Sequence, residues 1–238
     1  MSEKNETILK VVNINNYFGK KQFLKNVNFS IGSGEFHAFI GENGAGKTTT
    51  MCFISGILND YVGEIDFKNK PINEIENKSI LFVPERVSFP NHLTAFQFVN
   101  TFTSIFLGKK VNKADIDNLF KEFDISDIKD TKANKLSSGQ KKKVSLIRVI
   151  LSKPELLIID EPAANLDPTS RLKLFESLKK LNNEGTTIFI SSHIIAELEK
   201  YVDSATFIKK GGVVWTGKIN KNELGKKFED IIIKGGVA

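Results

Sequence analysis

The segment FHAFIGENGAGKT, residues 36–48, decides the fold of this chain of 238 residues. Residues 36–40 are mostly apolar and predict a strand, and residues 47–58 predict a helix. The glycine-rich loop between them, residues 41–48, fits the pattern G-x-x-x-x-G-K-[ST]. Glycines let the backbone curl around a β-phosphate with its N–H groups pointing inward, and the start of the helix adds partial positive charge. The segment therefore predicts a phosphate-binding P-loop.

Two side chains of this loop have predicted roles of their own. Lys47 supplies a full positive charge for the β and γ phosphates of a nucleotide, and the hydroxyl of Thr48 can ligate Mg²⁺. Backbone N–H groups make most of the contacts to the phosphates, so the neighbouring positions are candidate contacts whatever their side chains. The candidate nucleotide-binding residues of the loop are Gly41, Glu42, Asn43, Gly44, Ala45, Gly46, Lys47, Thr48 and Thr49. Alone, the loop indicates only a P-loop nucleotide-binding protein.

A second segment, residues 156–161, is an apolar strand that ends in two carboxylates. A strand covered on both faces does not tolerate acids at its middle, but at its carboxyl end they meet the phosphate site. We expect Asp160 to hold Mg²⁺ or its water, and Glu161 to polarise an attacking water molecule. General-base assistance of this kind contributes about 10²–10⁴ in rate.

A third segment, Leu136-Ser137-Ser138-Gly139-Gln140, precedes a helical stretch. A helix start rich in serine and glycine is an anion site by the same dipole argument as the P-loop. The simpler interpretation is an N-cap without a ligand. Since the chain already has one phosphate loop, a second phosphate site would serve the γ-phosphate bound to another copy of the chain.

The composition limits the classes of protein. With 40% hydrophobic and 26% charged residues the chain can bury a core, and no apolar run reaches the ~20 residues of a membrane span. The first residues have no secretory signal pattern, and the single cysteine, Cys52, fits a reducing, cytosolic setting. The net charge of +6 comes from scattered lysines with short runs such as residues 141–143, which we interpret as a solvated surface.

The pattern along the chain predicts one domain over residues 1–238. Its fold class is α/β, with a P-loop NTPase core of mostly parallel sheet, an antiparallel β flank and an inserted α-helical subdomain at about 86–150. Strands are expected over residues 8–12, 23–31, 36–40, 79–83, 156–159, 187–190, 206–208 and 213–215, and helical stretches over 47–58, 93–151 and 170–181. Residues 228–233 can be one more strand or a partner contact.

Taken together, these segments resemble the nucleotide-binding subunit of an ABC transporter. The resemblance extends from about residue 8 to residue 217. Residues 41–48 resemble Walker A, and residues 156–161 resemble Walker B. Residues 136–140 resemble the LSGGQ signature, Ala164-Asn165-Leu166-Asp167 the D-loop, and Ser191-Ser192-His193 the switch-histidine loop. The resemblance implies ATP and Mg²⁺ as cofactors. It also implies a head-to-tail dimer, of this chain alone or with a related ABC subunit, in which ATP lies between one subunit's Walker A and the other's signature.

The resemblance assigns further roles by position. Glu161 and His193 become the catalytic residues, with His193 at the γ-phosphate. Phe18 corresponds to an aromatic residue stacked on adenine, although Tyr17 is an alternative and either can instead be a core residue. Asp167 can cap its helix ahead of Pro168 and also reach across the dimer. The residues implied to contact the γ-phosphate of the partner's ATP are Ser137, Ser138, Gly139 and Gln140, and the implied metal ligands are Thr48, Asp160 and Glu85.

Two positions depart from the family pattern. Glu85 stands where the family has a glutamine, which adds negative charge near Asp160 and Glu161, and Arg86 is a candidate to offset it. Ser138 replaces the first glycine of the signature, while Ser137 and Gly139 are retained. No acidic segment precedes the signature, which speaks against an exporter with fused membrane and ATPase parts.

We therefore expect a cytosolic ATPase subunit, peripheral on the inner face of the membrane, that drives a separate transmembrane partner docked on the helical insert. The separate-subunit layout favours export of a drug, lipid or peptide. One alternative is an ABC ATPase without a transport role, for instance a factor associated with nucleic acid, although nucleic acid is not an expected partner. Another is a regulatory cassette that hydrolyses ATP weakly because of Glu85. A P-loop GTPase or kinase would leave the signature unexplained.

Overall fold

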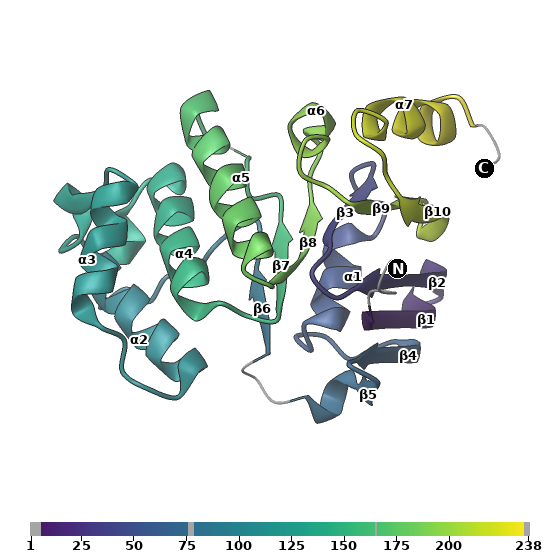
Figure 1. Ribbon diagram of the computed structural model, residues 1–238. Coiled ribbons are helices and arrows are strands. Elements are labelled where there is room, and N and C mark those ends of the chain that lie inside the picture. Colours follow the sequence, from purple (N-terminus) through teal and green to yellow (C-terminus); the bar gives the residue numbers. More distant parts are fainter. Residues whose placement is uncertain (1–5, 76–78, 165, 236–238) are drawn as a thin grey trace.

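A computed structural model describes residues 6–75, 79–164 and 166–235 (Figure 1). Its centre is a six-stranded sheet with the strand order β10-β9-β3-β8-β7-β6. Neighbouring strands from β9 to β6 are parallel, and β10 is antiparallel to β9. The six strands are β3 (Phe36–Gly41), β6 (Ile80–Val83), β7 (Leu156–Asp160), β8 (Thr187–Ser191), β9 (Ser204–Lys209) and β10 (Gly212–Lys218). The expected mostly parallel P-loop NTPase core is therefore confirmed.

The antiparallel flank is a separate four-stranded sheet with the order β2-β1-β4-β5. It consists of β1 (Thr7–Phe18), β2 (Lys21–Gly32), β4 (Val62–Phe67) and β5 (Lys70–Pro71). The first two strands are longer than predicted. Strands β4 and β5 were not predicted, because the first three residues of β4 are exposed and show no alternation of apolar and polar side chains.

Seven α-helices are described: α1 (Lys47–Ile54), α2 (Ala95–Leu107), α3 (Lys113–Glu122), α4 (Ser138–Ser152), α5 (Pro168–Asn183), α6 (Ile195–Leu198) and α7 (Leu224–Phe228). Short 3₁₀ turns lie at Ile72–Glu74, Ser126–Ile128 and Ala133–Lys135. Helix α1 ends earlier than predicted because Gly56 has a φ of 71°, a left-handed conformation that stops a helix. The strand alternative for residues 228–233 is wrong, since α7 continues into a π-helical turn at Glu229–Ile233.

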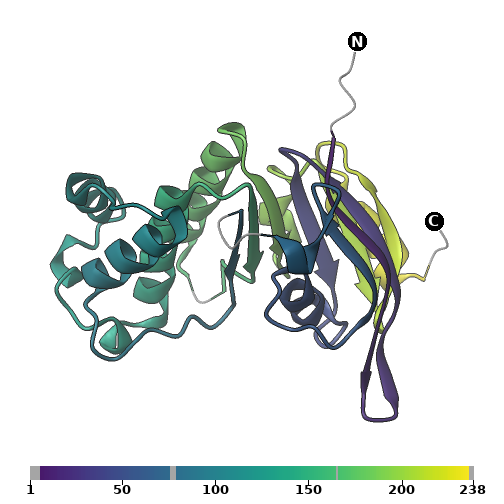
Figure 2. The ribbon, with the colours of Figure 1, turned by 90° about the horizontal axis from the view of Figure 1, so that it is seen from below.

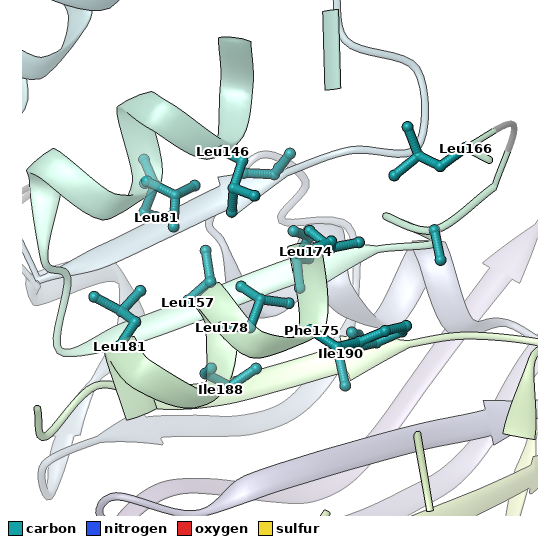
Figure 3. Close-up of a cluster of buried hydrophobic side chains, with 14 of the residues drawn as sticks. Leu81, Leu146, Leu157, Leu166, Leu174, Phe175, Leu178, Leu181, Ile188 and Ile190 are labelled. Carbon is teal, nitrogen blue, oxygen red and sulfur yellow. The ribbon is translucent and has the colours of Figure 1, made fainter. Parts of the chain in front are cut away.

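The two faces of the central sheet pack on different layers. Successive residues of a strand point to opposite faces, and in β7 Leu157 and Ile159 join one buried cluster while Leu156 and Ile158 join another. Helix α5 covers the first face, where Leu174, Phe175, Leu178 and Leu181 lie over β7 and β8 (Figure 3). Helix α1 and the four-stranded sheet cover the second face. Every residue of β7 and β8 is buried, which explains their unbroken apolar runs.

Helices α2, α3 and α4 follow β6 and precede β7 in the chain. They form a group of their own on one side of β6 and β7, while α1 lies on the other side, in both views (Figures 1 and 2). Their start and end signals are local: Thr94 and Ser137 cap α2 and α4 with reciprocal side-chain bonds, and Gly108, at φ 66°, ends α2.

Candidate nucleotide-binding and catalytic site

The glycine-rich loop joins the end of β3 to the start of α1 at the carboxyl edge of the central sheet. Gly46 caps α1 with a φ of 108°, and a Cβ atom there would collide with the side chain of Leu24. Gly41 needs the absence of a side chain for another reason, because a Cβ atom would collide with the carbonyl oxygen of Ile208 on β9. The surrounding structure thus requires glycine at positions 41 and 46 of the predicted P-loop, apart from any role in binding phosphate.

The turn between β9 and β10 supports the loop from behind. The N–H of Gly211 donates to the carbonyl oxygen of Ala45 at 3.1 Å, and the carbonyl oxygen of Gly211 accepts from the N–H of Lys25 on β2 at 2.8 Å. A Cβ atom on Gly211 would collide with the backbone of Phe23, so only glycine fits. One residue therefore joins the P-loop to the antiparallel sheet.

Lys47 places a buried positive charge inside the loop. The residue is 8% exposed. Its Nζ donates to the carbonyl oxygens of Gly41 at 2.7 Å and Glu42 at 3.3 Å. A buried ammonium group bonded to neutral oxygens retains its attraction for an anion, and charge-assisted bonds to phosphate are stronger than those to carbonyls. The surroundings of Lys47 therefore fit the phosphates of a nucleotide.

Thr48 and Asp160 come together from two segments, as predicted. The Thr48 hydroxyl donates to Asp160 Oδ2 at 2.6 Å, and the hydroxyl of Ser191 on β8 donates to Asp160 Oδ1. Hydroxyl and carboxylate oxygens are ligands that Mg²⁺ accepts, and Mg²⁺ in nucleotide sites takes only one or two of them besides phosphate and water. Among the described residues no group of three or more His, Cys, Asp or Glu could hold a metal ion.

Glu85, the third predicted metal ligand, is not brought into this group. It lies just after β6 and is exposed. No hydrogen bond joins it to Thr48 or Asp160 in the described part of the chain, and its expected partner Arg86 makes no ion pair with it there.

Glu161 and His193 form a pair at the ends of β7 and β8. Glu161 Oε2 accepts from His193 Nδ1 at 2.7 Å and from the His193 N–H at 3.2 Å. A carboxylate only accepts, so Nδ1 carries a proton and Nε2 is left to contact another group. The Glu161 side chain is 12% exposed and that of His193 61%. A carboxylate held by its neighbour and still open to solvent has the geometry of a general base.

The signature segment lies apart from the P-loop of the same chain. The hydroxyl of Ser137 accepts from the N–H of Gln140 at 3.2 Å, and Gln140 Oε1 accepts from the N–H of Ser137 at 2.9 Å. Ser137 thus caps α4, as the simpler interpretation predicted, while Ser137 and Ser138 remain exposed. None of the hydrogen bonds of the described residues joins residues 137–140 to residues 41–49.

Asp167 caps α5, as predicted, and accepts from the N–H of Ser170 at 2.9 Å, with Pro168 as the first helical residue. The hydrogen bond to Ser170 holds the pKa of Asp167 below its ordinary value. Of the neighbouring segment that resembles the D-loop, Asn165 lies outside the described residues.

Phe18 and Tyr17 end β1 with exposed rings, 73% and 54% of their surface being accessible. The alternative of a core role is therefore wrong for both residues. The Phe18 ring lies nearly perpendicular to the ring of Phe23, with 6.3 Å between centroids.

Sequence reasoning missed Lys142 on α4. The run 141–143 was expected to be solvated, but Lys142 is half-buried, and its Nζ donates to the carbonyl oxygens of Glu161 at 2.8 Å and Ala164 at 2.6 Å. Burial lowers the pKa of Lys142, and the nearby charges of Glu85, Glu161 and Asp160 oppose that shift. Its neighbours carry the same charge, so no pattern in the sequence distinguishes it.

A phosphate loop, a hydroxyl–carboxylate pair and a carboxylate–histidine pair at one sheet edge define a P-loop nucleotide hydrolase. The chain belongs to the ABC transporter family, since the family model described as ABC transporter matches residues 24–164. It is an ATP-binding subunit of that family and, by class, an ATP hydrolase.

Relatives and solved structures agree with this assignment. A Mycoplasma pneumoniae protein named as an ABC transporter ATP-binding protein is 40% identical over 237 residues, covering 93% of this chain and 71% of its own. The lantibiotic transport ATP-binding protein SrtF of Streptococcus pyogenes is 32% identical, covering 91% and 95%. A dimeric post-hydrolysis structure of an ATP-binding cassette with ADP and Pi superimposes with a TM-score of 0.81 at 25% identity, covering 89% and 99%.

Within residues 6–75, 79–164 and 166–235, no helix combines the length and the apolar character needed to cross a bilayer.

Proposed function

We propose that this chain hydrolyses ATP in a head-to-tail dimer and thereby drives a separate transmembrane partner that exports a drug, lipid or peptide. The dimer is formed by two copies of the chain or by this chain and a related subunit. The chain lies on the inner face of the membrane, held there by its partner. The helical insert at about 86–150, with residues 85–90 at its root, is the proposed docking face.

The main support for the proposed dimer is the distance between the two predicted phosphate sites within one chain. The P-loop begins α1 on one side of β6 and β7, and the capped start of α4 lies on the other side (Figures 1 and 2). Ser137 and Ser138 are exposed, and no hydrogen bond of the described residues joins residues 137–140 to residues 41–49. A second chain in the opposite orientation would bring these serines to the γ-phosphate, where the α4 N–H groups and dipole favour negative charge.

In the proposed mechanism the residues of one chain bind and position ATP. The loop amides and Lys47 bind the phosphates, and Thr48 and Asp160 would hold Mg²⁺, which supplies Lewis-acid stabilisation of phosphate charge when bound. Glu161 Oε2 accepts a proton from the attacking water, and His193 Nδ1–H keeps that oxygen oriented. His193 Nε2 faces the γ-phosphate, as the family resemblance implies, and donates to it when this nitrogen also carries a proton.

The direction of transport is proposed on two grounds. The chain carries the ATPase without membrane-spanning segments in its described part, the layout expected of a separate-subunit exporter. A relative with 32% identity is named for lantibiotic transport, which supports a substrate of the drug or peptide class.

The first test replaces the proposed base. Glu161→Gln should bind Mg-ATP with unchanged affinity, lose about 10²–10⁴ in turnover and accumulate as an ATP-bound dimer in light scattering. Glu176→Gln, a change at an exposed acid on α5, is the matched control and should leave turnover and oligomeric state unchanged. A monomeric Glu161→Gln protein with wild-type turnover would refute the role of Glu161.

The second test asks whether each site takes parts from two chains. Lys47→Met destroys a P-loop, and Gly139→Asp places a negative charge in the first turn of α4, where it repels phosphate but suits the helix dipole. Each variant alone should be inactive. A mixed dimer has one site with neither change, so mixing should restore activity. No recovery from a mixture that demonstrably forms heterodimers would exclude the head-to-tail arrangement.

A further inference from the structure

One lysine joins the helix that begins with the signature to the turn that carries the proposed base. Lys142 follows Ser137 by five positions on α4, and its Nζ donates to the carbonyl oxygens of Glu161 and Ala164. These two carbonyls mark the start and the end of the turn after β7, because the N–H of Ala164 also donates to the carbonyl oxygen of Glu161 at 3.3 Å. The ammonium group therefore closes the turn from the side of α4.

The turn needs such support because of the conformation of Glu161. Its φ of 44° lies in the left-handed region, which a residue with a side chain adopts only where its surroundings impose it. The Glu161 N–H donates to the carbonyl oxygen of Ser191 at 3.2 Å and to its hydroxyl at 3.0 Å. Lys142 holds the carbonyl on the other side of the same residue, so the peptide groups before and after Glu161 are both fixed by neighbouring segments.

Lys142 is half-buried, and both of its hydrogen-bond partners are neutral carbonyls. No ion pair joins it to a carboxylate in the described part of the chain. Its ammonium group therefore acts on the backbone of the turn.

We propose that Lys142 is a positioning residue for Glu161, which fixes the 161–164 turn against α4. The proposal rests on the proposed role of Glu161 as general base.

The main test separates positioning from binding. Lys142→Met removes both bonds to the turn and leaves the P-loop intact. A displacement of about 1 Å at a reacting group can cost 10²-fold in rate, so we expect kcat to fall at least tenfold while the Kd for Mg-ATP is unchanged. Lys142→Arg keeps a donor for both carbonyls and should recover a large part of kcat. Lys141→Met, a change at the preceding lysine, is the control and should match the wild type.

If Lys142→Met does not fold, the Lys142→Gln and Lys142→Arg proteins provide the same comparison.

The outcomes distinguish this inference from the proposed function. If Lys142→Met and Lys142→Gln retain wild-type kcat while Glu161→Gln is inactive, Lys142 does not position the base and the ATPase mechanism stands. If kcat falls and the Kd for Mg-ATP rises together in the lysine variants, and arginine recovers neither, the effect is general damage and the inference is wrong. If Glu161→Gln itself retains full turnover, the proposed function fails instead.

Discussion

His37 should make the stability of this protein depend on pH in a defined window. The residue lies on β3 and is 1% exposed, with Nδ1 at 2.7 Å from the Ser204 hydroxyl and Nε2 at 2.9 Å from the Thr206 hydroxyl. Its ring stacks on Phe29 at a centroid distance of 6.2 Å. Burial lowers the pKa of His37 from 6.5 to about 4, against the opposing charge of Glu35.

The sign and the size of the effect follow from proton linkage. Below pH 6.5 the unfolded chain binds a proton at His37, whereas the folded chain binds it only near pH 4. The contribution of neutral His37 to the free energy of unfolding is therefore fully present above pH 6.5 and is lost as the pH falls toward 4. At 1.36 kcal/mol per unit of pKa difference, the whole window corresponds to roughly 3 kcal/mol. Between pH 7 and pH 5 the free energy of unfolding should fall by about 2 kcal/mol on this account.

The assay is urea unfolding at pH 5, 6 and 7 for the wild type and His37→Gln, with the m-value checked for two-state behaviour. A glutamine amide can bond to both hydroxyls but does not titrate, so the variant should lose the dependence that His37 supplies. His92→Gln, a change at an exposed histidine, is the control and should keep it. The range stops at pH 5 because Glu35, whose pKa is lowered by its bonds to Lys218 and Ser204 despite burial, contributes only at lower pH. Parallel pH dependences for the wild type and His37→Gln would refute the reasoning.

Three further predictions concern the nucleotide site and the core. Lys47→Met should weaken Mg-ATP binding at least 10²-fold in calorimetry, because two charge-assisted bonds of about 1.5–3 kcal/mol are lost; unchanged affinity would contradict its role. Phe18→Ala should weaken ATP binding by the ~1–3 kcal/mol of a base–aromatic stack without lowering Tm, while Tyr17→Ala should not; equal effects would leave adenine stacking unsupported. Leu178→Ala should lower the free energy of unfolding by about 2–5 kcal/mol in urea titrations, since Leu178 is fully buried under β7 and β8; a loss below 1 kcal/mol would contradict tight packing there.

The sheet edge that carries the candidate site could be predicted because parallel strands align their carboxyl ends. Asp160, Glu161 and His193 follow unbroken apolar runs, and such runs occupy the buried centre of a parallel sheet. The residues directly after them therefore meet at one edge, where the 2.7 Å contact between Glu161 and His193 is found. The same reasoning placed Thr48 beside Asp160, because the loop after β3 ends at that edge.

Features that depend on contacts between distant segments could not be predicted. Lys142 differs from Lys141 and Lys143 only in which carbonyl groups lie within its reach, and the sequence does not contain that distance. Strand β4 is positioned by its pairing with β1, in which Leu9 lies opposite Phe67 and Val11 opposite Ile65. The first half of β4 is exposed. Tertiary pairing of this kind overrides a weak local pattern.

The contacts of Gly211 also bear on the order of events at the ribosome. The chain is synthesised from its amino end, so residues 41–48 leave the exit tunnel well before the β9–β10 hairpin does. Until Gly211 arrives, Ala45 lacks the bond that fastens its carbonyl group, and Lys25 lacks the acceptor on the same glycine. A nascent polypeptide thus carries its complete Walker A motif while one backbone bond that fixes the loop is still missing.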